Sequence, residues 1–317
     1  MNRRDIPMTP LKMPAAVAKK NTYNSVAVRA TAADKTFKVV VNIFMILILI
    51  VIAIPIWSTI ALSFRPANYI GSYLEGMFLA PWKWSTAAYR SLLGNQGFLR
   101  SFWNSIKITA MGVVVSLFLT VPMAYGLSVK GVPGKKWITI FVMIPYVFNV
   151  GVVPTYLLIS KLGLVNHLPS VFMPVALSTY NMIIMRQFFE GIPNDLRESA
   201  FIDGCNDMQI MFKIILPLSK AIIMTIALYY AVAFWNDYMR SLLYLQKSTL
   251  KPLPLLLRDI LLGAAMNDNL EASAFGSAPI EAIKAASVFI SAIPMIVAYP
   301  FIQKYFTKGT LAGSVKG

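Results

Sequence analysis

The sequence contains very few of the residues that build metal sites, disulfides and catalytic centres. Cys205 and His167 are each the only residue of their kind, so no intrachain disulfide can form and a zinc site of paired cysteines or histidines is not expected. There is no Gly-x-Ser-x-Gly turn. The segment Gly131-Val-Pro-Gly-Lys-Lys lacks the spacing and the hydroxyl of a phosphate-binding loop. We therefore expect no catalytic residue, no metal and no cofactor on this chain.

Charged residues are also scarce, at 13% of 317 residues, whereas 57% of the residues are hydrophobic. The apolar residues are concentrated in blocks of about 18 or more, which is long enough for a helix to cross roughly 30 Å of hydrocarbon. Only the fifth block carries charge, at Asp237 and Arg240. The pattern predicts an all-α integral membrane protein with six transmembrane helices, at Val39–Ser63, Ile108–Val129, Trp137–Ser160, Leu168–Met185, Ala221–Leu245 and Ala285–Gln303.

The formal charge of +16 comes from lysines and arginines that flank these blocks. Positive loops stay in the cytoplasm during insertion, so we expect both termini and the loop 186–220 on that side. Scattered basic residues favour anionic lipid over nucleic acid as a partner. The sequence predicts a disordered cytoplasmic tail over 1–36, a six-helix transmembrane domain over 37–304 that includes the loop 186–220, and a cytoplasmic tail over 305–317.

The loop 186–220 concentrates the charge that the apolar blocks exclude. Asn194 or Asp195 caps a predicted helix, and Gly204 is expected to end it because glycine tolerates the left-handed conformation. An apolar run then continues to Pro217. A helix hairpin of this kind either lies on the lipid surface or docks into a groove of a partner protein.

The residues of this hairpin resemble a family signature. Glu198-Ser-Ala-x-x-Asp-Gly204, followed by Phe212 and then Ile214-Ile-Leu-Pro217, is similar to the Glu-Ala-Ala-x-x-x-Gly coupling loop of binding-protein-dependent ABC importer permeases. The closing segment from Phe306 resembles the maltose-transporter (MalG-like) group. Arg186–Phe189, Leu216–Lys220 and Trp235–Tyr238 are similar to aldouronate-type (LplC-like) members. The resemblance extends over residues 33–317.

This resemblance implies a non-catalytic permease subunit of the bacterial cytoplasmic membrane. Its partners are a homologous second permease, two ATPase subunits that bind ATP and Mg, and an extracytoplasmic solute-binding protein. The ATPase-coupling residues implied are Glu198, Ser199, Ala200, Asp203 and Gly204. The alternative is that they only cap and fold the hairpin. Gly309, Gly313 and Lys316 either reach the ATPases or form a flexible end.

The substrate implied is a sugar or oligosaccharide, and basic residues in the outer loops hint at an acidic one, although a neutral one fits nearly as well. Candidate residues of the translocation path are Tyr180, Asn181, Trp235, Asn236, Asp237 and Tyr238. Asp237 alternatively pairs with Arg240 at i, i+3. An ion-coupled secondary transporter is the competing function, but it needs a central ionisable site and gives no reason for the hairpin.

Overall fold

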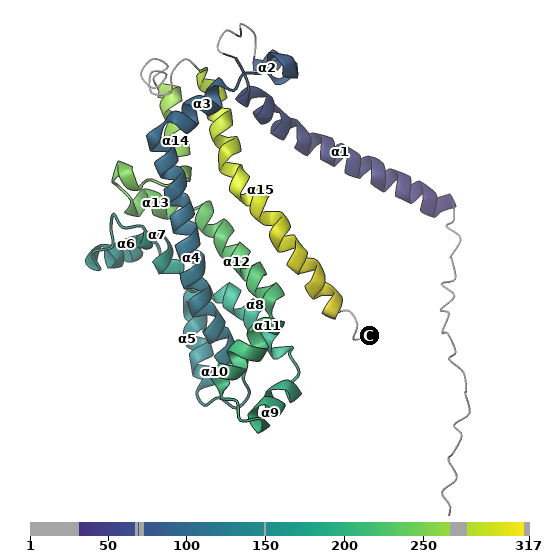
Figure 1. The fold of residues 1–317 in the computed structure, drawn as a ribbon, viewed down its shortest axis with the longest axis vertical. Helices are drawn as coiled ribbons and strands as arrows, with labels where there is room; N and C mark the ends of the chain where they lie inside the picture. The colour runs from purple at the N-terminus through teal and green to yellow at the C-terminus, as the bar shows by residue number, and fades with distance from the viewer. Residues whose placement is uncertain (1–31, 67–68, 70–72, 149, 267–277, 314–317) are drawn as a thin grey trace, which may run out of the picture. The chain divides into compact units, whose positions relative to one another are not determined.

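The computed structural model describes residues 32–66, 69, 73–148, 150–266 and 278–313, and describes their side chains except at 32–33, 73–74, 263–266 and 301–313. Regular structure in these ranges is entirely helical, in agreement with the all-α prediction (Figure 1). The chain divides into two compact units, residues 1–53 and 54–317, which are described separately.

The first unit ends within α1 (Ala32–Ser63), a helix of 32 residues. Most of its apolar side chains in this unit, such as Phe44, Leu49 and Ile50, are more than half exposed. A long helix whose apolar residues are exposed on every side is suited to lipid or to a neighbouring subunit.

The second unit holds the remaining helices. Before residue 170 these are α2 (Tyr73–Met77), η1 (Pro81–Lys83), α3 (Ala87–Gly94), α4 (Gln96–Ser128), α5 (Lys135–Val147), α6 (Val152–Lys161) and α7 (Pro169–Phe172). After it come η2 (Met173–Val175), α8 (Thr179–Glu190), α9 (Asp195–Ile202), α10 (Asp207–Ile210), the π-helix η3 (Met211–Ile215), α11 (Leu216–Leu218), α12 (Lys220–Trp235), α13 (Met239–Tyr244), η4 (Ser248–Leu250), α14 (Leu253–Met266) and α15 (Ile280–Gly313).

Three of the described helices are long and apolar enough to cross a membrane: Asp34–Ser63 of α1, α4, and Ile280–Pro300 of α15. Two bent pairs raise the number to five if each pair counts as one span. These are α5 with α6, bent by 113°, and Asp207–Leu218 with α12, bent by 83°. Several membrane-length helices agree with an integral membrane protein, while the count of six remains a prediction.

The prediction of continuous helices is wrong for three of the six blocks. Trp137–Ser160 breaks between α5 and α6, where Gly151 has φ +81°. Leu168–Met185 divides into α7, η2 and α8, because Pro169 and Pro174 donate no backbone hydrogen bond and Ser178 caps a new helix. Ala221–Leu245 breaks after Trp235, and α13 begins at Met239. Hydropathy detects apolar length but not these local interruptions.

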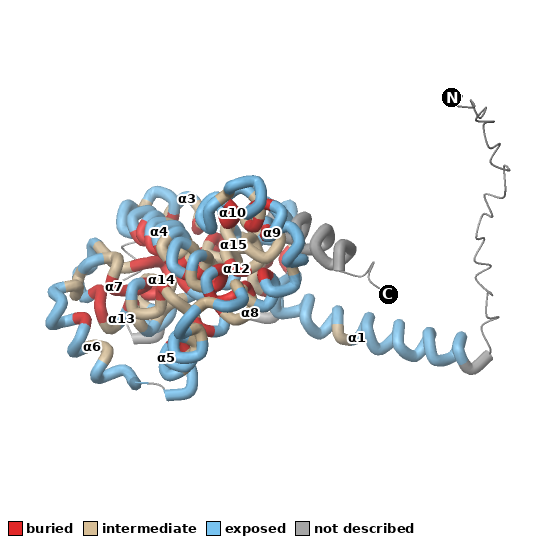
Figure 2. The backbone as a smooth tube through the Cα atoms, turned by 90° about the horizontal axis from the view of Figure 1, so that it is seen from below, coloured by how far each residue is buried: buried red, intermediate tan, exposed pale blue. Residues whose placement is uncertain are grey.

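The core of the second unit forms around α4, which packs against α8, α12 and α14, while α12 also packs against α15. Figure 2 shows the buried residues concentrated where these helices meet, whereas α5 and α6 are largely exposed. One glycine is required here: a Cβ at Gly112 would lie 2.6 Å from a ring carbon of Phe234. Gly112 therefore allows α4 and α12 to approach closely.

Candidate functional site

The hairpin, defined here as residues 195–218, has a turn whose geometry explains its glycine. Gly204 has φ +79°, its N–H donates to the Phe201 carbonyl at 3.0 Å, and the Cys205 N–H donates to the Ala200 carbonyl at 2.9 Å. These two bonds form a Schellman motif, in which a left-handed residue ends a helix and satisfies its last carbonyls. The sequence prediction that Gly204 ends the first helix agrees with this geometry.

The second arm of the hairpin starts from a reciprocal cap that the sequence analysis missed. Asn206 Oδ1 accepts the Gln209 N–H at 2.8 Å, and Gln209 Oε1 accepts the Asn206 N–H at 3.0 Å. The spacing Asn-x-x-Gln was the available signal. The chain then passes through the π-helix η3, a feature that often marks functional segments, before α11 leads into α12.

One side of the hairpin is buried in the core and the other side is exposed. Ala200, Ile210, Met211 and Ile215 belong to the same apolar cluster as Phe189 of α8. On the other side of α9, Glu198, Ser199 and Asp203 are exposed, as are the apolar Phe201 and Ile202, the latter 86% exposed. Of the predicted coupling residues, Ala200 thus packs inward against its own chain, while Glu198, Ser199, Asp203 and Gly204 lie on the accessible side.

Arg197 anchors the hairpin to the end of α4. Its side chain is buried, with the residue only 7% exposed, and Nη2 donates to Ser128 Oγ at 2.9 Å. The guanidinium carbon lies 5.1 Å from the centre of the Tyr125 ring. The last carbonyls of α4 also favour a cation at this end of the helix. The sequence analysis treated Arg197 only as a loop charge, and no motif distinguishes it.

Beside the hairpin, Glu190 joins α8 to the start of α5. Its Oε1 accepts from Arg186 Nε at 2.9 Å and lies 3.5 Å from Lys135 Nζ. Burial alone raises the pKa of the Glu190 carboxyl, but the Arg186 hydrogen bond and the positive charges of Arg186 and Lys135 outweigh burial and lower it. The ionised Glu190 side chain therefore links α8 to the start of α5.

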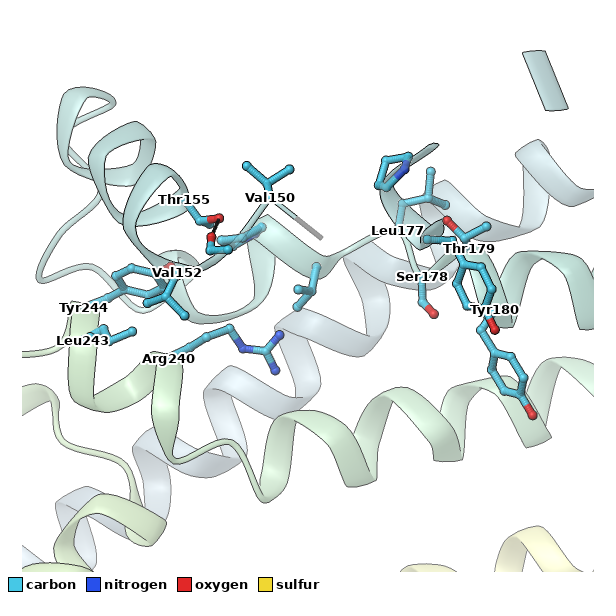
Figure 3. A pocket seen from close by; sticks show the side chains of 15 residues that line it. Val150, Val152, Thr155, Leu177, Ser178, Thr179, Tyr180, Arg240, Leu243 and Tyr244 are labelled. Atoms are coloured by element: carbon cyan, nitrogen blue, oxygen red, sulfur yellow. Dashed lines mark hydrogen bonds between the residues drawn. The ribbon is translucent and has the colours of Figure 1, made fainter. Parts of the chain in front are cut away.

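A second feature is a cavity of about 630 Å³, called here the Tyr180 cavity, which is bounded by the end of α5, the start of α6, the 174–180 segment and α13 (Figure 3). Its volume lies within the range of about 300–1,000 Å³ typical of small-molecule sites. Three tyrosines and one arginine give it polar groups among apolar ones: Tyr146, Tyr180, Tyr244 and Arg240.

The structure does not bring the six predicted path residues together. Only Tyr180 lines the Tyr180 cavity. Asn181 is buried beside its capping residue Ser178. Trp235 is buried and donates from Nε1 to the Ser291 carbonyl at 3.1 Å, while Asn236 Nδ2 donates to the Val232 carbonyl at 3.0 Å. The Trp235 indole and the Asn236 amide are thus hydrogen-bonded within the fold.

The remaining two path residues pair with arginines. Arg240 Nε donates to Asp237 Oδ2 at 2.7 Å, which is the i, i+3 pair expected as the alternative for Asp237. The Tyr238 ring lies 5.7 Å from the Arg258 guanidinium carbon, outside the Tyr180 cavity. Arg240 was not predicted as a cavity residue, because it reaches the cavity wall only through the break between α12 and α13.

Some predicted regions fall partly outside the described residues. Gly309 and Gly313 lie on the described backbone of α15, which extends through most of the predicted tail 305–317, whereas Lys316 lies beyond the described ranges. Of the predicted disordered tail 1–36, residues 1–31 lie outside the described ranges, but residues 32–36 already belong to α1, so the predicted boundary was wrong. Among the residues that the structure describes, no three His, Cys, Asp or Glu side chains gather as a metal site would require.

The family of the chain follows from comparison with known proteins. The model of the family described as "Binding-protein-dependent transport system inner membrane component" matches residues 104–312, which is more than half of the chain and includes the hairpin and the Tyr180 cavity. The chain belongs to this family of transporter permease components. This confirms the family that the hairpin signature indicated.

Two Bacillus subtilis (strain 168) relatives refine the comparison. The polygalacturonan/rhamnogalacturonan transport system permease protein YtcP is 38% identical over 90% of this chain and 99% of its own length. The protein LplC is 39% identical over 77% of this chain and 83% of its own. Both agree with the LplC-like resemblance, and neither supports an ion-coupled transporter.

A solved structure shows the same fold. A bacterial ABC transporter involved in the import of the acidic polysaccharide alginate has a chain that superposes with a TM-score of 0.79 and is 29% identical, covering 87% of this chain and 98% of that one. A structure of a bacterial alginate ABC transporter in complex with an alginate pentasaccharide-bound periplasmic protein contains a chain that is 16% identical and superposes with a TM-score of 0.56, covering 85% of this chain and 93% of that one, and agrees in fold.

Proposed function

We propose that this chain is one of two permease subunits of an ABC importer in the bacterial cytoplasmic membrane, with both termini in the cytoplasm. It translocates an oligosaccharide by alternating access, driven by two partner ATPases that bind ATP and Mg. The chain itself binds no cofactor and catalyses no reaction. The observation that carries this proposal is the hairpin. One side of it is exposed and accessible to a partner, and the other side is fixed to the membrane helices.

The hairpin is better suited to a protein groove than to a lipid surface. The free side of α9 combines the acidic residues Asp195, Glu198 and Asp203 with the exposed Phe201 and Ile202. Helices that lie on anionic lipid carry lysine and arginine on their polar face, whereas α9 presents carboxylates. An apolar anchor beside acidic groups fits a partner cleft. The ATPase subunits are the partner proposed, with Glu198 and Asp203 as contacts.

Force applied to α9 has a direct route into the transmembrane helices. Arg197 connects α9 to the end of α4, and η3 and α11 continue the second arm into α12. The helices α4 and α12 pack closely at Gly112. A rotation of the hairpin is therefore transmitted to the centre of the helix bundle. Six crossings are proposed, with α5–α6 and the 169–185 segment as interrupted ones.

The proposed substrate is an acidic oligosaccharide. YtcP is named for polygalacturonan and rhamnogalacturonan, and the superposed transporter chain belongs to an alginate importer, so both relatives handle uronate-containing chains. The proposed partners are a homologous second permease, two ATPases and an extracytoplasmic solute-binding protein. Gly309, Gly313 and Lys316 are proposed to reach the ATPases.

The test is reconstitution of the complete importer in proteoliposomes with its solute-binding protein. Uptake of a labelled uronate oligosaccharide is expected to require ATP on the cytoplasmic side, and Glu198→Ala is expected to reduce uptake while leaving the amount of membrane-inserted chain unchanged. Uptake that is indifferent to ATP, or driven by an ion gradient alone, would overturn the proposal.

A further inference from the structure

Arg240 lies on α13 at the wall of the Tyr180 cavity, just after the break that follows α12. Figure 3 shows its guanidinium directed into the space between Tyr244 on one side and Tyr180 on the other. Its side chain is 25% exposed, so it is partly shielded from bulk water but still accessible from the cavity. An accessible, partly desolvated arginine is a strong binding group for an anion.

Asp237 binds this arginine through the Nε side of the guanidinium. Asp237 Oδ2 accepts from Arg240 Nε at 2.7 Å, Asp237 Oδ1 accepts the Arg240 backbone N–H at 3.3 Å, and the Asp237 side chain is only 7% exposed. Within the described part of the chain, the guanidinium has no other hydrogen-bond partner than Asp237. The terminal Nη groups thus remain for a ligand, in the planar arrangement that matches a carboxylate.

The surrounding walls suit a sugar ring. Tyr146 and Tyr180 are more than half exposed, and Tyr244 is held in place by stacking on Tyr156 with ring centres 6.1 Å apart. Tyrosine offers an apolar face to the C–H side of a pyranose and a hydroxyl to its polar edge. In addition, α8 begins at Thr179 on this wall, so the positive end of its dipole adds to the field of Arg240.

We propose that Arg240 binds the carboxylate of a uronate residue of the translocated oligosaccharide in the Tyr180 cavity, with Asp237 as the residue that positions the guanidinium. The inference rests on the proposed function and adds to it a defined subsite and a charge requirement. The competing explanation is that Arg240 only neutralises Asp237. The two explanations differ in what a variant that removes both charges should do.

The experiment measures ATP-dependent uptake of labelled trigalacturonate by the reconstituted importer with its solute-binding protein at saturation, normalised to the amount of assembled complex. Arg240→Lys keeps a cation beside Asp237 but loses the planar pair of donors, and we expect uptake to fall roughly tenfold. Asp237→Asn keeps the arginine, so a smaller loss is expected. The double variant Asp237→Asn/Arg240→Gln is expected to lose uptake as strongly as Arg240→Gln alone.

Arg258→Lys is the control, because Arg258 is an arginine of α14 that lies over the Tyr238 ring outside the cavity, and uptake by this variant should equal that of the wild type. Wild-type uptake in the double variant or in Arg240→Lys would show that the pair is purely structural and would overturn the inference. Because Arg240→Lys retains a partner for Asp237, it distinguishes the two explanations even if the double variant does not assemble.

ATP-dependent import of neutral oligosaccharides only would overturn the inference but leave the permease function standing, whereas loss of ATP dependence in the wild type would overturn the proposed function.

Discussion

At the scale of single residues, the proposed coupling depends on one buried arginine that joins the hairpin to a membrane-length helix. Arg197 has almost no exposed surface and, among the described residues, no carboxylate partner, yet it joins α9 to Ser128 and Tyr125 at the end of α4. Its Nε is also buried without a hydrogen-bond partner in the described part of the chain. Arg197 thus connects α9 rigidly to α4, and its loss should weaken the coupling between ATP hydrolysis and transport.

Arg197→Ala removes a buried charged hydrogen bond and a cation–π contact, and is expected to destabilise the hairpin by about 1–3 kcal/mol. Uptake by the reconstituted importer should fall more than ATP hydrolysis, because the hairpin then moves without α4. Ser128→Ala is the matched variant, and the pair should be non-additive in a double-mutant cycle. Additive effects of the two substitutions would argue against a direct connection.

Gly204→Ala forces a side chain into a conformation with φ +79°, at an expected cost of about 1–2 kcal/mol. Gly204→Asn should be tolerated better, since asparagine adopts the left-handed region more readily. Thermal unfolding of the purified complex measures the difference. Equal stability of the alanine and asparagine variants would contradict the strained-turn account.

Glu190 gives the chain a defined response to acid. Its pKa in the folded protein lies below the ordinary value of 4.5, so the carboxylate stabilises the fold fully above about that pH, and this stabilisation is lost as the pH falls through the lowered pKa. Glu190→Gln should therefore reduce thermal stability at neutral pH, and the gap to the wild type should narrow as the pH is lowered below about 4.5. A gap that widens on acidification would show that the pairing with Arg186 and Lys135 is not stabilising.

At the scale of elements, the interrupted helices matter more than the continuous ones. The break at Gly151 and the break after Trp235 place α6 and α13 around the Tyr180 cavity. The hairpin and its turn at Gly204 were predictable, because capping residues and glycine act locally in sequence, but the inward packing of Ala200, predicted as a coupling residue, was not. The breaks inside apolar blocks were not predicted, since hydropathy averages over Gly151, Pro169 and Pro174. The role of Arg240 depends on such a break and was therefore missed.

The close approach of α4 and α12 can be tested by adding a side chain at Gly112. Gly112→Ala places a Cβ 2.6 Å from the Phe234 ring, so the helices must separate or the ring must move, and we expect a destabilisation of about 1–3 kcal/mol with reduced uptake. Gly126→Ala is the control on the same helix, because a Cβ there meets nothing within 4 Å. Similar thermal stability of the two variants would show that the close approach is not required.

At the scale of the whole molecule, the described residues combine three membrane-length helices and two bent helix pairs with the accessible hairpin that we propose as the partner contact. Composition was sufficient to predict an all-α membrane protein, because the shortage of charge acts over the whole length. The arrangement of α4, α8 and α12 was not predictable, since it depends on close packing between residues far apart in sequence, such as Gly112 and Phe234.

If the exposed side of α9 touches an ATPase in the cytoplasm, as proposed, site-directed cross-linking in the assembled importer should detect the contact. In a Cys205→Ala background, Ser199→Cys places one exposed thiol on that face, and Thr86→Cys provides an exposed control ahead of α3. The account predicts that a short thiol cross-linker joins residue 199, but not residue 86, to an ATPase subunit in a nucleotide-dependent manner. Labelling of residue 199 from outside the cell, or its failure to cross-link to an ATPase in a complex that hydrolyses ATP and transports, would contradict the account.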